Sequence, residues 1–431
     1  MQDAAHDTPV RIHEGDARAL LAGSGPENRE ERADLDGRYR HVRLFLQSPS
    51  FLHAQRQMLS RQGRSNAHTL FGIETIPSDN HVRKMLDGVP AGHFDPVFHH
   101  VVDGLKRRGA LEKLRRLNGH LLVALDGTEY VSSTRIECPN CSTQKQSDGT
   151  IRHYHAMVGA SIVAPGSAEL LPLPPEFITP QDGAGKQDCE RAAVKRWLAR
   201  VGPWAARLKP ICLGDDLYCC QPVCEAIGNA GGHFILTCKP GNHTTLYEYI
   251  HGVALDEARR TRRLGGKRKH HFHYRWMNDL PLRDGPGAMK VGWFEITVTS
   301  ETGKQVYYST FATDITITKD NIAELAECAR TRWTVENSVF RELKKFFHLE
   351  HNFGHGESTV SSVLAMFNLV ALLMQSACQM VCPRWKAARK RWVARYQMLD
   401  QLKILVNYVV FGNWDQFLVS ITTDQLPEQP P

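Results

Sequence analysis

The sequence contains no uninterrupted apolar run of the roughly 18 to 20 residues that a helix needs to span a bilayer. Its longest apolar stretch, at about 363–374, is interrupted by Asn368 and is typical of a buried helix. The N-terminus, MQDAAHDTPVRIHEGDARAL, is polar and acidic early on, unlike a secretory signal. At 42% apolar and 23% charged residues, the composition is that of an ordinary globular protein. We therefore expect a cytoplasmic protein with no membrane partner.

A disulfide framework is also missing. The 431 residues include 11 cysteines, an odd number, and the chain is far longer than a small secreted domain. These features favour reduced thiols. Five of the cysteines lie close together, and we expect buried small apolar side chains there in preference to metal ligands: Cys212, Cys219, Cys220, Cys224 and Cys238.

The net charge of +7 is modest, but the basic residues are clustered. One cluster comprises Arg259, Arg260, Arg262, Arg263, Lys267, Arg268, Lys269 and Arg275, and a second comprises Arg384, Lys386, Arg389, Lys390, Arg391 and Arg395. Clustered Lys and Arg are the electrostatic footprint of a protein that binds phosphate backbones. A solvated basic face remains the alternative for either cluster.

The hydrophobic pattern predicts an α/β protein with helical regions at both ends. We expect a flexible arm at 1–40, a helical domain at 41–118 that is either DNA-binding or a plain bundle, an α/β segment at 119–239, a β-rich basic insertion at 240–318, a long helix and following loop at 319–356, and a helical region with a disordered tail at 357–431. Within 119–239 the predicted order is three strands, a helix, a strand, a helix and a strand. That order indicates a layered sheet flanked by helices.

Three acids occupy distinctive positions in this pattern. Asp126 ends the first predicted strand, Asp215 (beside Asp216) ends the strand after the first α/β helix, and Glu336 lies within the long helix. Strand ends at one edge of an α/β sheet lie close together, and a helix crossing that edge could supply the third carboxylate. Taken singly, an Asp-Gly turn or a solvated helical Glu is the simpler interpretation.

Three carboxylates are a natural number for two hard divalent cations. Mg²⁺ takes carboxylate and water oxygens. Two such ions, roughly 3.5 to 4 Å apart, can stabilise the attacking and leaving oxygens of a phosphodiester displacement. Without metal, converging carboxylates would repel each other and their pKa values would rise.

Four motifs surround these acids: LVALDGTEY, LGDDLY, ARTRWTVENSVFRELKK and EHNFGHG. Together they make residues 119–356 resemble the DDE transposases of bacterial insertion sequences, in the branch with a Tyr-Arg-Glu-Lys signature. The resemblance implies an RNase H-like catalytic domain with a β-rich insertion, and Mg²⁺ or Mn²⁺ held by Asp126, Asp215 and Glu336. Asp215 is favoured over Asp216 because Tyr218 then follows at the family's spacing of three residues.

The signature helix departs from the family pattern at two positions. Ala329 stands where the family has Tyr, and Leu343 stands where it has Lys. Lys344 arrives one residue late, which on a helix is about 100° of rotation. Arg332 matches the signature and lies one turn before Glu336. We expect the neighbouring Trp333 to be a core residue.

The resemblance implies cleavage at the ends of a mobile element, attack of the freed 3′-OH on target DNA, and two protomers on paired ends. A metal-dependent nuclease of the same fold without strand transfer would need the same three acids. A non-catalytic DNA-binding descendant is the third alternative. The expected DNA contacts are Lys239, Arg332, Lys344, Arg262, Arg263, Lys267, Arg268 and Lys269.

A separate set of residues has zinc-ligand character. Cys138-Pro-Asn-Cys141 is followed by His153 and His155, which would project from the same face of one strand. Two cysteines and two histidines suit tetrahedral, structural Zn²⁺, although a hairpin without metal remains the alternative. His351, Asn352 and His355 follow the signature helix, where DNA contacts and a simple turn are equally compatible with the sequence.

Overall fold

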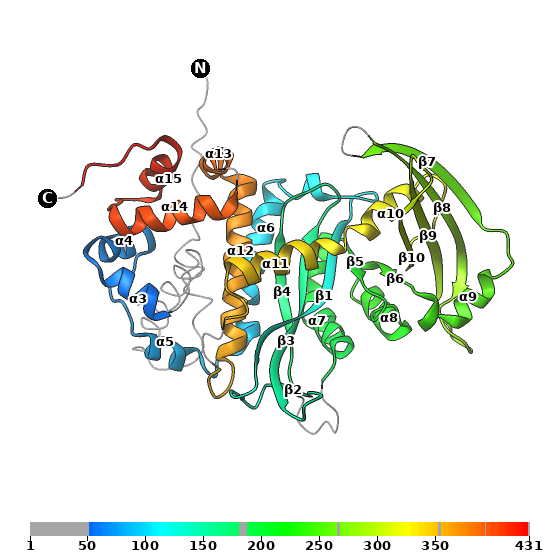
Figure 1. The fold of residues 1–431 in the computed structure, drawn as a ribbon, viewed down its shortest axis with the longest axis horizontal. Coiled ribbons are helices and arrows are strands. Elements are labelled where there is room, and N and C mark those ends of the chain that lie inside the picture. Colours follow the sequence, from blue (N-terminus) through cyan, green and yellow to red (C-terminus); the bar gives the residue numbers. More distant parts are fainter. Residues whose placement is uncertain (1–50, 181–187, 265–267, 352–354, 393, 430–431) are drawn as a thin grey trace, which may run out of the picture. The chain divides into compact units, whose positions relative to one another are not determined.

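The computed structural model describes residues 51–180, 188–264, 268–351, 355–392 and 394–429. The expected arm at 1–40 and Lys267 lie outside these residues. The chain forms two compact units (Figure 1). The sheet unit comprises 111–128 and 156–341, and the helical unit comprises 1–110, 129–155 and 342–431.

A mixed sheet forms the framework of the described chain, in the order β2-β3-β1-β5-β6-β10-β9-β8-β7, with β4 paired to β3. Its strands are β1 (Leu121–Ser133), β2 (Ser142–Lys145), β3 (Ile151–Val163), β4 (Leu171–Ile178), β5 (Pro210–Gly214), β6 (His233–Thr237), β7 (Asp256–Leu264), β8 (Arg268–Pro281), β9 (Lys290–Ser300) and β10 (Gln305–Thr313). β5 runs parallel to both β1 and β6. The α/β fold class predicted from the sequence, an RNase H-like mixed sheet flanked by helices, is confirmed.

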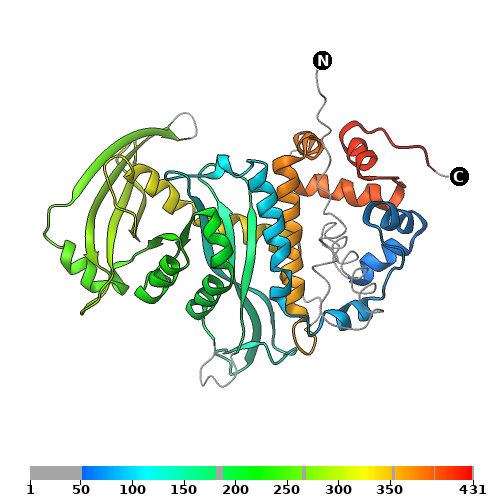
Figure 2. The same cartoon turned by 180° about the vertical axis from the view of Figure 1, so that it is seen from behind.

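Helices cover both faces of the central strands in the sheet unit. The first five residues of β1 are all buried, as in a strand covered on both sides. α7 (Glu190–Ala205) and α8 (Gln221–Asn229) connect β4, β5 and β6, and they pack against each other on one face (Figure 2). Right-handed crossovers in one direction place successive helices on the same face. α10 (Ile322–Arg330) packs on β6 from the other face.

The strand-rich segment continues the central sheet. β10 pairs with β6 in antiparallel fashion, with Phe311 opposite Thr237, and β9, β8 and β7 follow in order. Alternate residues Phe272, Tyr274 and Trp276 of β8 are buried, so one face of these strands packs inward. α9 (Thr244–Ile250) also packs on β8.

The helical unit is built around a buried apolar core. Its helices are α3 (Phe51–Leu59), α4 (Arg61–Phe71), α5 (Asp79–Leu86), α6 (Asp95–Arg107), α12 (Val360–Val381), α13 (Pro383–Arg391), α14 (Arg395–Tyr408) and α15 (Trp414–Thr423). The buried amide of Asn66 on α4 donates to the carbonyls of Val406 and Val409, at 2.6 and 2.7 Å. The same side chain accepts from the Phe411 amide at 2.9 Å. These bonds satisfy polar backbone groups inside the core, where unpaired ones would be costly.

No uninterrupted apolar run in the sequence is long enough to cross a membrane, but the helix α12 is long and apolar enough to do so. Its 22 residues meet that test by length and composition, but 89% of the apolar window is buried within the protein. This burial agrees with the expected buried helix around Asn368, which is itself 1% exposed. Neighbouring helices such as α6 cover it.

The single long helix predicted over 319–347 is interrupted. α10 ends at Arg330, a π-helical turn, η5, spans Val335–Phe340, and α11 spans Arg341–Phe346. Between α10 and η5 the backbone tightens into i→i−3 bonds, such as Thr331 N–H to Cys328 O at 3.0 Å. The Thr331 hydroxyl also bonds the Glu327 carbonyl at 2.9 Å, a side-chain contact that disturbs regular helix. Remaining short 3₁₀ turns are η1 (Ala91–Phe94), η2 (Glu112–Leu114), η3 (Ala206–Leu208) and η4 (Pro240–Asn242).

Candidate active site

The register of β1 and β5 brings the first two acids together. Leu121 lies opposite Pro210, and Ala124 lies opposite Leu213. Asp126 lies two residues after Ala124, and Asp215 lies two residues after Leu213. The two carboxylates therefore leave neighbouring strands at the same level and on the same face. Adjacent strands lie about 4.8 Å apart, which allows both carboxylates to bind one ion.

Asp215 and Asp216 have different surroundings. Asp216 is 8% exposed, and its carboxylate accepts the Lys239 backbone N–H at 2.6 Å and the Asn242 amide. Its Oδ1 also lies 3.3 Å from His243 Nε2. Asp215 is only half-buried and accepts the Leu217 N–H at 3.0 Å. These contacts engage Asp216 in the framework, which favours Asp215 as the metal ligand.

Glu336 is exposed on the π-helical turn η5. Phe340 of the same turn packs against Gly159 of β3, so closely that a Cβ at Gly159 would lie 2.5 Å from the phenyl ring. The absence of a side chain at Gly159 therefore sets how near this turn lies to the sheet. π-helical turns of this kind occur frequently at functional sites.

The carboxylates interact strongly in the absence of metal. Burial raises the pKa of Asp126 to about 7; the nearby Arg332 opposes this effect, and Glu190, Glu336 and Asp215 add to it. The Arg332 guanidinium lies 3.9 Å from the Asp126 carboxylate. Arg332 is thus the one cation named beside four acids, and their ionised carboxylates would carry more negative charge than it can balance. Divalent cations bound here would neutralise that excess charge.

Glu190 is a fourth acid at this site, and we did not predict it from the sequence. Its carboxylate accepts the Tyr218 hydroxyl and the Gly127 backbone N–H. Burial raises its pKa, and Asp215 also contributes to the increase. The available signal was weak, since an acid in the first turn of a helix is ordinary N-terminal chemistry. These contacts give the Tyr218 of the LGDDLY motif a structural partner.

A comparison with protein families gives a match at this site. The family model described as the transposase DDE domain matches residues 182–373. The chain carries a transposase DDE domain. The matched residues include Asp215 and Glu336, whereas Asp126 precedes them. No curated protein matches the chain.

Divalent metal ions are the general cofactor of DDE transposases. The residues of this chain fit that requirement, because Asp126, Asp215 and Glu336 offer hard oxygen ligands and the Asp126 carboxylate is held in an electrostatically unfavourable environment. Arg332, one of the expected DNA contacts, lies within this group against Asp126.

Trp333 differs from its expected core position. Its side chain is 57% exposed, three residues before Glu336. The tightened backbone between α10 and η5 changes the helical phase, so the amphipathic pattern across 319–347 does not give the correct face for Trp333. The chain therefore exposes a large aromatic side chain three residues before its candidate metal ligand.

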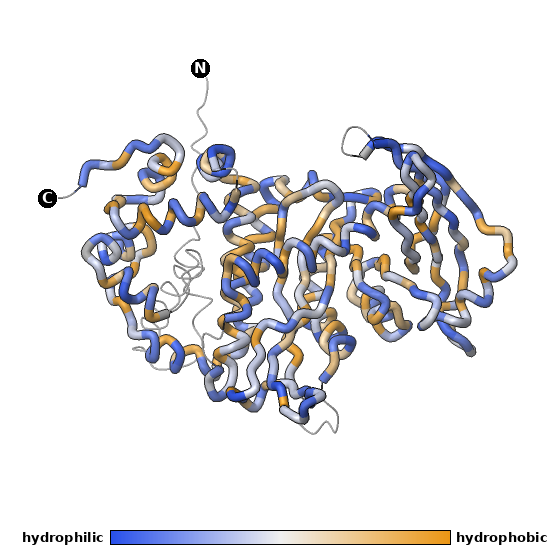
Figure 3. The backbone as a smooth tube through the Cα atoms, in the orientation of Figure 1, coloured by the Kyte–Doolittle hydropathy of each residue, from blue (hydrophilic) through white to orange (hydrophobic). Residues whose placement is uncertain are grey.

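The first basic cluster divides between the two faces of the β7–β8 hairpin. Arg262 lies opposite His270 and shares the face of Phe272; it forms an ion pair with Glu327 of α10. Arg263 lies on the other face, directly opposite Lys269, and both are exposed. Figure 3 shows β7 as mostly hydrophilic. Arg268 is exposed at the start of β8.

The other expected DNA contacts lie in different settings. Lys239 is exposed just after β6. The ammonium group of Lys344 forms an ion pair with the Glu350 carboxylate at 2.8 Å. In a π turn the backbone hydrogen bonds join residues i and i+5, so the turn contains one residue more than an α-helical turn. Lys344 therefore leaves the helix in the direction that residue 343 would have if the helix were uninterrupted. This places Lys344 at the angular position of the Lys in the family signature. In the second basic cluster, Arg384, Arg391 and Arg395 form ion pairs with acids of the helical unit.

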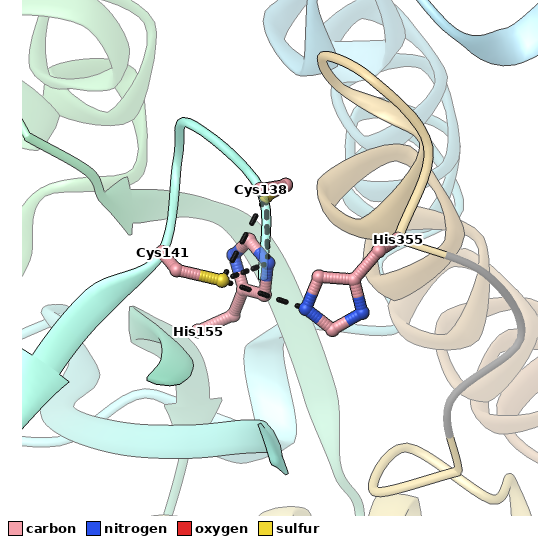
Figure 4. Close-up of side chains that lie close together, drawn as sticks. All are labelled: Cys138, Cys141, His155 and His355. Atoms are coloured by element: carbon pink, nitrogen blue, oxygen red, sulfur yellow. Dashed lines mark hydrogen bonds between the residues drawn. The ribbon is translucent and has the colours of Figure 1, made fainter. Parts of the chain in front are cut away.

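The cysteine pair of the helical unit lies against His155, as expected, but the second histidine is His355 and not the expected His153. Cys138, Cys141, His155 and His355 have ligand atoms that all lie within 4.8 Å of one another (Figure 4). His153 is not in this group; its Nε2 lies 3.2 Å from Glu137. His153 and His155 are two residues apart on β3 and so about 7 Å apart. Of these two histidines, His155 is the one that lies near the cysteines. His355 comes from the loop before α12, a distant segment that local spacing could not select.

Proposed function

We propose that this chain is a transposase that cuts DNA at the ends of a mobile element and joins those ends to target DNA. The observation that carries the proposal is the charge around Asp126: the Asp215 and Glu336 carboxylates, both within the matched transposase DDE domain, help burial to raise its pKa to about 7. When bound on these carboxylates, two Mg²⁺ or Mn²⁺ ions would supply positive charge to the attacking and leaving oxygens of a phosphodiester.

The surrounding residues position the acids. Arg332 balances part of the charge on Asp126, while Glu190 ties the Gly127 backbone to Tyr218. Asp126 and Tyr218 belong to different strand-end motifs, so Glu190 connects the two. This network holds both strand ends at one spacing without metal, which reduces the rearrangement needed when ions bind.

DNA would contact the β7–β8 hairpin through Arg263 and Lys269. Like charges directly opposite each other destabilise a sheet, and here neither side chain has an acidic partner among the ion pairs of the described residues. A phosphate backbone would relieve that repulsion and release counterions. Trp333 offers a flat surface on which an unstacked base near the cleavage point could lie. We further propose that two protomers act on paired ends.

The test uses the purified chain, Mg²⁺ and DNA carrying the ends of the encoding element. We expect nicking and joined products from the wild type. Glu336→Gln should abolish both, because the amide cannot replace an anionic ligand, whereas Glu301→Gln in the exposed β9–β10 turn should retain both. Cleavage that persists in Glu336→Gln contradicts the site, and cleavage without joining indicates a nuclease of the same fold.

A further inference from the structure

The Cys/His group in the helical unit combines three separate segments. Cys138 and Cys141 lie in the turn between β1 and β2, His155 lies on β3, and His355 lies in the loop before α12. Cys141, His155 and His355 are 6%, 3% and 7% exposed. Figure 4 shows the four side chains directed toward a common point. The catalytic residues described above do not account for this convergence.

The distances between the ligand atoms match those of a tetrahedral zinc site. With Zn–S about 2.3 Å and Zn–N about 2.05 Å, tetrahedral angles place two sulfurs about 3.8 Å apart and a sulfur and a nitrogen about 3.6 Å apart. The two Sγ atoms lie 3.8 Å apart, and His155 Nε2 lies 3.4 Å from Cys138 Sγ and 3.5 Å from Cys141 Sγ. His355 Nε2 lies 3.5 Å from Cys141 Sγ. All four of these separations lie within about 0.2 Å of the tetrahedral values.

A disulfide or a site for a hard cation fits these four side chains less well than zinc does. A disulfide requires an S–S distance of about 2.05 Å, much shorter than the 3.8 Å between these sulfurs. The ligands are thiol and imidazole groups, which select zinc over Mg²⁺ or Ca²⁺. Four protein ligands complete a tetrahedron and leave no position for substrate, which distinguishes a structural site from a catalytic one.

We infer that Cys138, Cys141, His155 and His355 form a structural zinc site that fastens the β1–β2 turn and β3 to the loop before α12. Independent contacts already hold that loop in place. Asn140 donates to the Ser358 carbonyl at 2.5 Å, and Asp87 accepts the backbone N–H groups of residues 357–360. The inference does not depend on the proposed function, since a zinc site of this kind would stabilise a nuclease or a DNA-binding protein equally.

A second cysteine and histidine group in the sheet unit serves as the competitor. Cys219, Cys238 and His243 also have ligand atoms within 4.8 Å of one another. This group has three ligands, and its histidine already contacts Asp216 at 3.3 Å. Zinc bound there would survive substitution of Cys138 or His355, so the two sites can be distinguished.

The experiment measures zinc in the full chain expressed with added zinc and purified by gel filtration. Elemental analysis should give about one zinc per chain in the wild type. We expect His153→Ala to retain this zinc and His355→Ala to lose most of it. His355→Cys should keep the zinc, because a thiolate can replace the imidazole. This variant separates metal binding from a simple hydrogen-bonded cluster.

Cobalt substitution supplies a second measurement, whose first part needs only the wild-type protein. Co²⁺ bound to the wild type should give the intense visible bands of tetrahedral coordination and a sulfur-to-cobalt charge-transfer band that increases in His355→Cys. Zinc-free wild-type protein overturns the inference. Zinc that is retained in Cys138→Ser/Cys141→Ser but lost in Cys219→Ser/Cys238→Ser also overturns it and assigns the metal to the competing group.

Discussion

At the scale of single residues, the candidate site is a balance of charges. Asp126 is 16% exposed in its side chain and faces one cation, Arg332, together with the Glu190, Glu336 and Asp215 carboxylates. Burial and these neighbours make the ionised form of Asp126 unfavourable in the metal-free protein. Divalent cations would relieve this cost, so the stability of the unit and its affinity for metal should be linked.

Asp126→Asn tests this link. The neutral amide removes the repulsion, so we expect metal-free Asp126→Asn to unfold a few degrees higher than the wild type at pH 7. Added Mn²⁺ should raise the Tm of the wild type and raise that of the variant much less. Scanning calorimetry with and without Mn²⁺ gives both comparisons. Equal Mn²⁺-induced shifts in the two proteins would remove Asp126 from the set of metal ligands.

Gly127→Ala tests the positioning role of Glu190. A Cβ at position 127 would lie 2.3 to 2.8 Å from the Glu190 carboxylate, which must then move away from Tyr218 and the strand end. We expect DNA cleavage to fall at least tenfold while the fold is retained. Gly104→Ala on α6 is the matched control, because a Cβ there would meet only the end of the Arg107 side chain, at 3.8 Å. In a helix this change should stabilise the protein by about 0.5–1 kcal/mol.

At the scale of elements, the β7–β8 hairpin has one face that packs inward and one exposed face, which we propose contacts DNA. Arg262 is paired with Glu327, whereas Arg263 and Lys269 lie opposite each other on the far face. Pattern alone could not separate these residues in the sequence, because the faces depend on the pairing register. The difference predicts unequal contributions to DNA binding.

Arg263→Ser/Lys269→Ser should weaken binding to DNA of any sequence. Removal of two phosphate contacts should reduce the slope of log affinity against log salt by roughly 1.8, at about 0.9 for each contact. Arg262→Ser should change that slope much less. Fluorescence anisotropy across a salt series measures both variants. An unchanged slope in the double variant would show that this face does not contact phosphates.

The start of α12 depends on a residue that is distant in sequence. Asp87 accepts backbone N–H groups of Glu357, Ser358 and Thr359 at 2.5, 2.9 and 2.8 Å. Burial acts to raise the pKa of Asp87, but these bonds outweigh that effect and lower it below 3.8. The folded pKa is depressed, so the stabilisation is present above about pH 4 and is lost as pH falls through the folded value.

Asp87→Asn should therefore destabilise the protein at pH 7 by about 1 kcal/mol, the usual contribution of a helix cap. The difference from the wild type should shrink as the pH falls below about 4, which denaturant titrations at several pH values can measure. Asp79→Asn is the control, because Asp79 is a half-buried acid of the same helix whose ion pair is with the Arg83 side chain, at 3.5 Å, and not with backbone groups of α12. A constant difference across this pH range would contradict the assigned role of the Asp87 charge.

At the scale of the whole molecule, local pattern predicted the α/β fold class, which depends on strand ends and helical periodicity. The same logic located Asp126, Asp215 and Glu336, whose roles in metal binding remain predictions. It failed where distant segments meet: Glu190, His355 and the extension of the sheet through β10 depend on long-range pairing. It also failed at η5, because a π turn has no sequence signature separate from that of a helix.

The pairing of β6 with β10 has a consequence for how this chain can be shortened. β6 has β5 on one side and β10 on the other, so the segment from β7 to β10 closes what would otherwise be an open row of backbone donors and acceptors. Unprotected strand edges recruit other chains. A deletion of residues 244–318 should therefore yield aggregates, as seen by light scattering, and no smaller soluble enzyme. In evolutionary terms, the insertion cannot be lost in one step without first protecting the strand that it covers.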